Sequence, residues 1–345
     1  MRRDSLLKTA KILLFCLPLL VFQNCTKESL TEETNVAQTT PDVTIELDQL
    51  EEYETLGDET AVERHHHRIT FNTLNAAIAC AGLGDVVFSG KKTVYAPSDE
   101  AFAKLGLNAS NVCGALDKET LTNILAYHVN EGIITIRERG CIEPLNGDVA
   151  RLDFRNHRYF INDSRLIGRG IMNGRGFLTV IYAIDMVLMP PANNIVETAI
   201  AADGFNSLVA AVLAADPSIA TALSNDDAIF TVFAPTDQAF ADLLGALGVS
   251  SLEEAVAAVG VEGLTTILLY HVVDACATSN DLKNGMMITT LQGETVRVDL
   301  RKRSIVDKTG TGARLVHGGI NILTANGYIH AIDKVLLPQA IIDAL

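Results

Sequence analysis

The sequence has no tryptophan, few aromatic residues (6%) and fewer basic than acidic side chains, 27 Lys and Arg against 42 Asp and Glu. The formal net charge is −15. Binding to phosphates requires a basic surface, so this balance argues against a nucleic-acid partner. Hydrophobic residues make up 48% of the 345 positions, which allows about two domains with cores of their own.

Short catalytic motifs are also missing. The chain contains no G-x-S-x-G elbow, phosphate-binding loop, C-x-x-C pair or H-E-x-x-H zinc motif. His65, His66 and His67 are consecutive, so they share no helix face and make a poor preorganised metal site. We therefore expect no enzyme activity, no metal and no cofactor.

Only one long apolar run occurs, and it lies near the N-terminus. Residues 12–22 are almost wholly apolar and follow a positive head made by Arg2, Arg3, Lys8 and Lys11. A membrane-spanning helix needs about twenty apolar residues, so the run predicts a signal peptide over residues 1–24.

Cys25 follows this run directly and resembles the lipidated cysteine of bacterial lipoproteins. The four residues before it, Val-Phe-Gln-Asn, are larger than is usual there, so a signal peptide with an incidental cysteine is the alternative. With lipidation, the protein is expected to be an exported outer-membrane lipoprotein, on the cell surface or in the periplasm. Its only contact with the membrane would be the lipid anchor.

An acidic segment comes next. Residues 26–66 hold twelve acidic residues against Lys27 and Arg64. Such a segment buries too little apolar surface to fold, and its charges repel one another. Residues 25–66 are therefore expected to be a lipidated cysteine and a flexible tether, in which 46–56 could form one helical stretch.

The remainder contains an internal repeat. TVYAPSDEAF at 93–102 matches TVFAPTDQAF at 231–240, and LTNILAYHVN at 121–130 matches LTTILLYHVV at 264–273. IYAIDMVLMP at 181–190 matches IHAIDKVLLP at 329–338. Three blocks in the same order indicate two copies of one domain, over residues 67–191 and 192–345.

Each copy has helical spacing first and strand-like alternation later. Residues 71–83, 121–127, 195–214 and 264–270 favour helices, whereas 133–190 and 286–338 favour short strands, the last block being a closing strand. Ser98 and Thr236 are placed to cap the helix that follows each buried Thr-Val-aromatic-Ala strand. The pattern predicts an α+β fold for both domains.

The three blocks resemble the fasciclin domain family over nearly everything after residue 67. The resemblance implies a wedge or sandwich of β-strands flanked by several helices. It also implies roles in adhesion and matrix binding rather than catalysis. The first copy departs from the family's last block, because Tyr182 stands where the second copy has His330.

The resemblance draws attention to Tyr127–His128 and Tyr270–His271. These pairs could shape a partner-binding face. The structural alternative is a half-buried tyrosine and a histidine that satisfies backbone groups at a helix end. Asp99, Asp185, Asp237 and Asp333 could be proposed as catalytic carboxylates, but their repetition favours helix capping or bonds to loop amides.

Four cysteines follow the signal region and Cys25, namely Cys80, Cys113, Cys141 and Cys276. A Cys80–Cys113 disulfide is the preferred pairing in an exported protein, and Cys276 has no expected partner in its own domain. The alternative is that all four are small buried apolar residues.

Arginines are numerous in the first domain's strand region (Arg151, Arg155, Arg158, Arg165, Arg169, Arg175), with a counterpart at Arg297, Arg301, Lys302 and Arg303. Solvated hairpin residues are the simple interpretation, and docking of a polyanion is the alternative. For the whole chain we expect an adhesion or binding module for a protein or polysaccharide partner. A carrier of a small apolar ligand and a hydrolase are the alternatives, and the sequence leaves the oligomeric state open.

Overall fold

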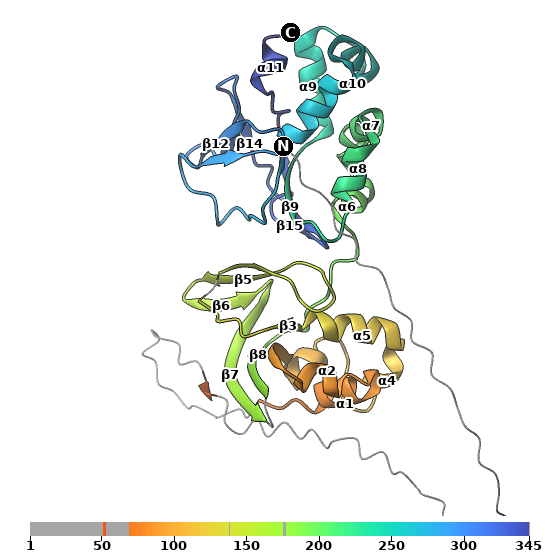
Figure 1. The fold of residues 1–345 in the computed structure, drawn as a ribbon, viewed down its shortest axis with the longest axis vertical. Helices are drawn as coiled ribbons and strands as arrows, with labels where there is room; N and C mark the ends of the chain where they lie inside the picture. Colours follow the sequence, from red (N-terminus) through yellow and green to blue (C-terminus); the bar gives the residue numbers. More distant parts are fainter. Residues whose placement is uncertain (1–50, 53–68, 138, 175–176, 345) are drawn as a thin grey trace, which may run out of the picture. The chain divides into compact units, whose positions relative to one another are not determined.

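The computed structural model describes residues 51–52, 69–137, 139–174 and 177–344 (Figure 1). Within these ranges the chain forms two α+β domains, as the repeat predicts, and each has helices before most of its strands. Cys25, the three consecutive histidines and nearly all of the expected tether lie outside the described residues.

The first domain's described helices are α1 (Asn72–Ala81), α2 (Gly84–Phe88), α3 (Asp99–Ala103), α4 (Val112–Ala115) and α5 (Lys118–Tyr127). Its strands are β2 (Lys91–Pro97), β3 (Val129–Glu131), β4 (Gly140–Ile142), β5 (Ala150–Arg155), β6 (Arg158–Ile161), β7 (Ser164–Gly174) and β8 (Phe177–Ile184). They form one sheet in the order β3-β2-β8-β7-β6-β5-β4. The strands of the first and last repeated blocks, β2 and β8, are parallel neighbours in its interior.

Part of the expected tether joins this sheet. Glu51 and Glu52 form the short strand β1 (Glu51–Glu52), which pairs with Arg169 and Gly168 of β7. The helix considered for residues 46–56 is therefore wrong at these two positions, because their backbone is extended and pairs with a strand edge.

The second domain's described helices are α6 (Ile195–Ala201), α7 (Asn206–Ala214), α8 (Pro217–Leu223), α9 (Asp237–Leu247), α10 (Leu252–Tyr270) and α11 (Gln339–Ile342). One sheet, in the order β10-β9-β16-β15, contains β9 (Phe230–Pro235), β10 (Val272–Val273), β15 (Ile322–Thr324) and β16 (Gly327–Ile332). A second sheet runs in the order β11 (Met287–Thr289), β12 (Thr295–Asp299), β13 (Ser304–Val306) and β14 (Gly312–Arg314). As in the first domain, the strands of the first and last blocks, β9 and β16, are parallel neighbours.

Two predicted elements are shorter than expected. The helix expected over 195–214 is broken into α6 and α7 near Gly204, which has a φ of 96° that side chains disfavour. The closing strands end at Ile184 and Ile332, so the Asp-x-Val-Leu-x-Pro part of each last block is irregular. This irregular segment supplies backbone groups to the site described below.

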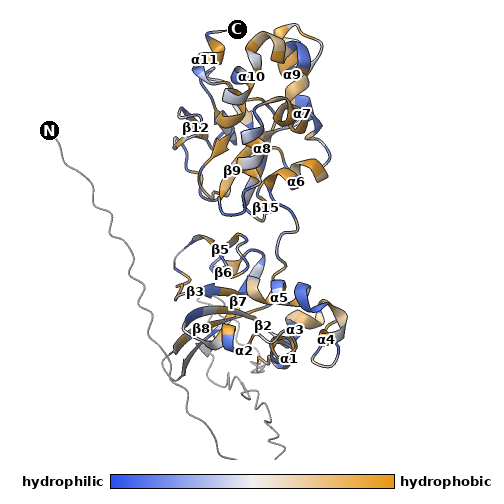
Figure 2. Cartoon of the chain, turned by 45° about the vertical axis from the view of Figure 1, so that its right-hand side comes forward, coloured by the Kyte–Doolittle hydropathy of each residue, from blue (hydrophilic) through white to orange (hydrophobic). Residues whose placement is uncertain are grey.

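Each domain has a helix-side core and a sheet-side core, and Figure 2 shows apolar residues gathered on the inner faces of helices and strands. Tyr95, Tyr127 and Tyr270 are among the largest fully buried side chains. No single helix within the described ranges is long and apolar enough to cross a membrane. Taken together, α9 and α10 are long and apolar enough to cross a membrane, but the two helices are bent by 86° relative to each other.

Candidate functional site

The tyrosine–histidine pairs lie at the C-terminal ends of α5 and α10. His128 and His271 are the residues that end these helices, and each is followed by the short strand β3 or β10. Tyr127 and Tyr270 are 0% exposed, and both histidines are 2% exposed. The four side chains are therefore core residues and contact no solvent-borne partner directly.

Each histidine joins its helix to the last block of its domain. His128 Nδ1 lies 2.7 Å from the carbonyl oxygen of Ile124, and its Nε2 accepts a hydrogen bond from the Leu188 N–H at 2.9 Å. His271 repeats this with the Ile267 oxygen and the Leu336 N–H, both at 2.8 Å. Because Nε2 faces a donor and Nδ1 faces an acceptor, the proton is on Nδ1 and the ring is neutral.

Burial keeps these rings neutral. It lowers the pKa of His128 and of His271 to about 4, although the bond to the carbonyl oxygen opposes this change. The C-terminal end of a helix favours a positive charge, but desolvation outweighs this effect at both positions.

The tyrosine hydroxyls reach the strand region instead. Tyr127 donates to the Val149 carbonyl oxygen at 2.8 Å and accepts from Asn162 Nδ2 at 2.9 Å. Tyr270 donates to the Thr295 carbonyl oxygen at 3.2 Å. Desolvation raises the pKa of both hydroxyls. The tyrosines are thus fully buried rather than half buried, and they tie the helices to the strands.

The first repeated aspartate caps a helix that precedes it in the chain. Asp99 Oδ1 accepts from the Thr73 N–H at 2.8 Å, and Oδ2 accepts from the Thr70 hydroxyl at 2.6 Å. Asp99 thus provides an acceptor for a free N–H group in the first turn of α1, whose own N-cap residue supplies no side-chain bond. Burial raises the pKa of Asp99, but the hydrogen bonds outweigh it and leave the pKa below its usual value.

Asp237 plays the same role in the second domain. Its Oδ1 accepts from the Ser207 N–H at 2.6 Å, at the start of α7. The predicted caps are also present, since the Ser98 and Thr236 hydroxyls accept from the N–H groups of Ala101 and Ala239. The sequence therefore identified these positions as structural, but it did not show that the aspartate caps the earlier helix.

Asp185 and Asp333 bind backbone amides at the ends of strands β7 and β14, not the loop amides that the sequence suggested. Asp185 Oδ1 accepts from the Arg165 N–H at 2.8 Å, and Asp333 Oδ1 accepts from the Arg314 N–H at 2.6 Å. None of the four repeated aspartates lies beside a histidine in a catalytic arrangement among the described residues, and no group of three metal-ligating side chains occurs there.

Sequence reasoning assigned no contact to two further pairs of equivalent residues. Thr93 and Thr231 each donate a hydroxyl to, and accept from, the loop after the tyrosine–histidine motif. Tyr182 and His330 both reach that loop, through the Ile134 oxygen at 3.2 Å and the Ala277 oxygen at 3.0 Å. The exchange of Tyr182 for His330 therefore keeps one contact with a different side chain.

A comparison with known families agrees with this repeated geometry. The fasciclin domain model matches residues 69–190 and 203–338. The chain belongs to the fasciclin domain family. The two matches contain both tyrosine–histidine pairs and all four repeated aspartates.

Several relatives are similar to this tandem pair. Human periostin is 30% identical over 257 residues, which are 73% of this chain and 29% of periostin. Pig transforming growth factor-beta-induced protein ig-h3 is 25% identical over 256 residues, 73% of this chain and 35% of that protein. Protein sll1483 of Synechocystis is 36% identical over 148 residues, 43% of this chain and 74% of that protein. The chain thus spans about a third of the length of periostin and ig-h3.

A solved FAS1 domain pair from the insect cell adhesion molecule Fasciclin I was also matched. The match covers 78% of this chain and 98% of that one, with 18% identity and a TM-score of 0.37.

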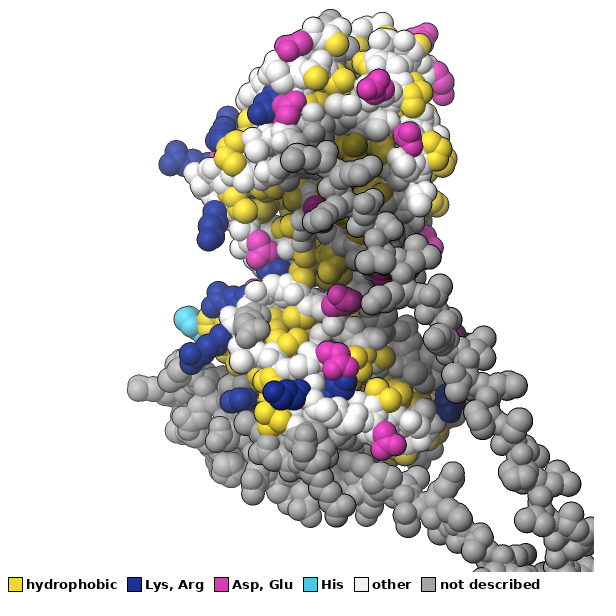
Figure 3. All heavy atoms as spheres, in the orientation of Figure 1, with side chains coloured by type: hydrophobic (Ala, Val, Ile, Leu, Met, Phe, Trp, Pro, Cys, Tyr) yellow, Lys and Arg dark blue, Asp and Glu magenta, His cyan; other side chains and the backbone are white. Residues whose placement is uncertain are grey.

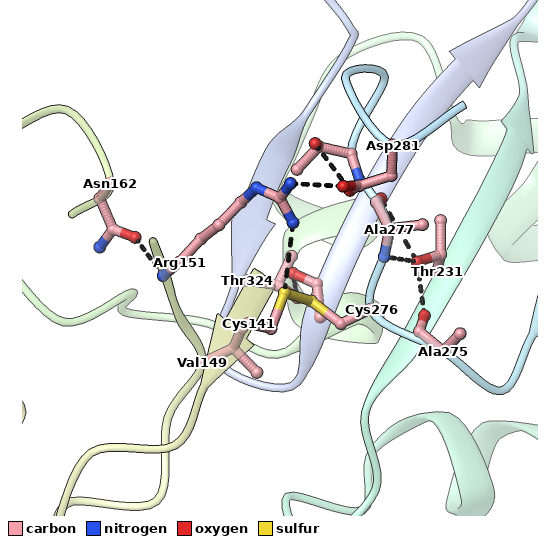
Figure 4. Close-up of a disulfide and its surroundings, with 12 residues drawn as sticks. Cys141, Val149, Arg151, Asn162, Thr231, Ala275, Cys276, Ala277, Asp281 and Thr324 are labelled. Atoms are coloured by element: carbon pink, nitrogen blue, oxygen red, sulfur yellow. Dashed lines mark hydrogen bonds and ion pairs between the residues drawn. A yellow bond between two sulfur atoms is a disulfide. The ribbon is translucent and has the colours of Figure 1, made fainter. Parts of the chain in front are cut away.

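Two disulfides are present among the described residues. Cys80 is bonded to Cys113 within the first fasciclin domain, so the structure contains the preferred pair. Cys141 is bonded to Cys276, which lies in the second fasciclin domain (Figure 4). From the sequence we expected no partner for Cys276 in its own domain. In the structure its partner, Cys141, comes from the first fasciclin domain.

Polar contacts surround this second disulfide. Arg151 Nη2 lies 2.6 Å from Asp281 Oδ1, which belongs to the second fasciclin domain, and Arg151 is only 5% exposed (Figure 4). The Asp281 carboxylate also accepts from the Thr278 N–H at 2.7 Å. Desolvation raises the pKa of Asp281, but the bonds from Arg151 and Thr278 outweigh it and lower the pKa overall. The interpretation of the arginine group as solvated side chains is therefore wrong for Arg151.

An apolar cavity of about 70 Å³ lies in the second fasciclin domain. Side chains from α6, α7 and α8 line one side, and residues of β9 and β16 line the other. The His271 ring is its one titratable neighbour, and both ring nitrogens are already hydrogen-bonded. The cavity therefore offers hydrocarbon contacts only.

Proposed function

We propose that the chain is an exported, lipid-anchored binding module whose two fasciclin domains attach to a protein or polysaccharide on a cell surface or matrix. One observation carries the proposal. The repeated histidines and the aspartates Asp99 and Asp237 make internal hydrogen bonds in both domains, which supports a role in holding the fold together rather than in catalysis.

Partner binding is then a property of exposed surfaces, which differ between the two copies. The tyrosine–histidine pairs support these surfaces from inside, because they connect the end of a helix to the last block of each domain. Substitutions there change binding by destabilising the domain rather than by removing a contact with the partner.

The cross-domain disulfide supports a two-site mode of attachment. A covalent bond between residues 135 positions apart restricts how far the two domains separate. If both domains engage one surface, the second contact forms at a high effective concentration, and the combined attachment exceeds that of either domain.

Carriage of a small apolar ligand is less well supported. Ligand pockets in proteins usually measure about 300–1,000 Å³. The apolar cavity of about 70 Å³ is several times smaller, so it holds at most a small apolar group. The hypothesis of a hydrolase has still less support, because the four repeated aspartates serve as helix caps and as acceptors for backbone amides.

The proposal of a lipid anchor is based on the sequence alone. Cys25 follows an apolar run with a positive head, and the acidic segment after it would hold the domains away from the lipid. We propose lipidation of Cys25 and attachment to the outer membrane, with the domains on the cell surface or in the periplasm.

A binding screen tests the module. The chain from Thr26 to Leu345, which keeps every described residue, would be presented to cells, matrix proteins and a glycan array. We expect saturable binding to one of these surfaces. A His128→Gln variant is the matched control, because its binding should fall only in proportion to its unfolded fraction. Absence of binding in all formats by folded protein would contradict the proposal.

A further inference from the structure

The turn between β12 and β13 of the second fasciclin domain carries adjacent cationic side chains. Asp299 Oδ1 accepts from the N–H groups of Arg301 at 3.1 Å and of Lys302 at 3.3 Å. The Arg303 N–H closes the turn on the Leu300 oxygen at 3.3 Å. The Oδ1 oxygen of Asp299 is engaged by two backbone donors, and the three cationic side chains are exposed.

A neighbouring segment extends this cationic surface. The Leu300 N–H donates to Asn284 Oδ1 at 3.0 Å, and the Gly285 N–H donates to the Val298 oxygen at 2.8 Å. Met287 pairs across the strands with Arg297. We call the resulting surface the basic tip, and its cations are Lys283, Arg297, Arg301, Lys302 and Arg303.

The basic tip also exposes apolar side chains. Leu300 and Met286 are both 42% exposed, and Met287 is 55% exposed. None of these is aromatic. Aliphatic and thioether groups flanked by cations are typical of surfaces that enter a lipid interface.

Charge is distributed unevenly in this domain. Residues 192–345 hold eight Lys and Arg against seventeen Asp and Glu, and five of the eight basic residues belong to the tip. Within the described residues, no ion pair involves these five. Figure 3 shows Lys and Arg gathered on the side of the second domain where the β11–β14 sheet lies.

The corresponding hairpin of the first domain differs. Arg155 lies 3.2 Å from Asp163 and 4.4 Å from the centre of the Phe160 ring. Arg139 stacks over the Phe154 ring at 4.9 Å. Arg155 of this hairpin is thus engaged within the domain, whereas Arg158 is exposed. The pair serves as a control of equal charge in the first domain.

We propose that the second fasciclin domain docks on an anionic lipid surface through the basic tip, with Leu300, Met286 and Met287 entering the headgroup region. An acidic polysaccharide is the less suitable occupant, because the tip offers no aromatic ring for a sugar to stack on. Acidic side chains elsewhere in the domain oppose this docking little where they lie more than about 10 Å from the lipid surface, because charges are screened over that distance at moderate salt. This docking goes beyond the proposed adhesion and does not depend on lipidation of Cys25.

Vesicle co-sedimentation tests the proposal. The chain from Thr26 to Leu345, which has no Cys25, would be mixed with neutral phosphatidylcholine vesicles and with vesicles containing phosphatidylglycerol. We expect binding to the anionic vesicles alone, weakened by salt. Each cation near such a surface contributes about fivefold to partitioning, so Arg301→Gln/Lys302→Gln should weaken binding about 25-fold.

Two further variants make the result specific. Leu300→Ser should weaken binding and leave its salt dependence unchanged, because it removes no charge. Arg155→Gln/Arg158→Gln removes the same charge from the first domain and should retain most binding. Every variant is first shown to unfold at the same urea concentration as the parent.

Three results would overturn the proposal. These are equal binding to neutral vesicles, equal loss in both arginine variants, and binding to dextran sulfate without binding to anionic vesicles. The last result would assign the tip to a polysaccharide.

Discussion

His128 and His271 each connect two backbone groups that lie far apart in the chain. The ring bridges the carbonyl oxygen of the residue four positions earlier and an N–H 60 or 65 positions later, in the last block. Both partners would lose a bond inside the core if the ring were removed. The pair of contacts explains why one residue type serves at this position in both domains.

Removal of one ring should therefore be costly. We expect His271→Ala to lower the free energy of unfolding of the second domain by about 2–4 kcal/mol, because a buried N–H loses its acceptor and a cavity forms. Urea denaturation followed by circular dichroism measures this. The exposed His317→Ala is the control and should change stability little. An equal and small effect of both substitutions would contradict the structural role.

The same histidines predict how stability depends on pH. Their pKa is about 4 in the fold and about 6.5 when unfolded, so the unfolded state binds protons first. Stability is therefore highest above pH 6.5 and falls as the pH decreases toward 4. Between pH 7 and 5 each domain should lose about 2 kcal/mol from its histidine.

This pH dependence is measured by urea denaturation at both pH values. A His128→Gln/His271→Gln variant should show most of the loss removed, although its stability is lower throughout. A loss of the same size in that variant would assign the dependence to other groups.

At the residue scale the sequence identified the repeated positions but not their partners. The blocks showed that Tyr127–His128, Asp99 and Asp185 have equivalents, and repetition favoured structural roles for the two aspartates. The proton position on His128 depends on the Leu188 N–H, which lies 60 residues away, so local sequence gives no sign of it. The shared contact of Tyr182 and His330 was hidden because different side chains reach the same loop.

At the scale of elements, α1 and α7 depend on a cap supplied from another part of the chain. Asp99 and Asp237 follow strands β2 and β9 and bind the first turns of the earlier helices. Each aspartate therefore fixes a helix against the strand that carries it.

We expect Asp99→Ala to lower the free energy of unfolding of the first domain by about 1–2 kcal/mol, because the start of α1 loses its acceptor. Asp99→Asn keeps one acceptor oxygen and should cost less. Chemical denaturation of the two variants measures the difference. Equal costs would show that charge rather than capping is the main contribution.

The sequence predicted most elements but misjudged several ends. Helical spacing continues through residues 195–214, and the break at Gly204 depends on a left-handed backbone conformation that periodicity does not detect. Similarly, the closing strands stop at Ile184 and Ile332, before the segments that bind the histidines. The requirement for glycine at position 327, where β16 begins, is likewise not visible in the periodicity. A Cβ at this position would collide with the Phe230 carbonyl oxygen of the neighbouring strand.

At the scale of the whole molecule, the Cys141–Cys276 disulfide joins two domains that each have their own core. The sequence predicted the domain pair from its repeat. It did not reveal this bond, because the pairing requires the folded positions of loops in both copies.

Peptide mapping without reduction should find Cys141 linked to Cys276. In the Cys141→Ser/Cys276→Ser variant, protease cleavage between the domains should release two separate pieces on a non-reducing gel, whereas the parent's pieces stay joined. Cys80→Ser/Cys113→Ser is the control and should keep the pieces joined. Free thiols at Cys141 and Cys276 in the exported protein would contradict the account.

Lipid labelling with a test of surface access addresses the central claim, a displayed and lipid-anchored binding module. Cells would be fed an alkyne palmitate analogue, and native protein would be compared with Cys25→Ala before intact cells are treated with protease. The account predicts label that is lost in Cys25→Ala, together with cleavage of the folded domains from outside. Label on a protected protein would place the module in the periplasm, and absence of label on the native protein would contradict the anchor.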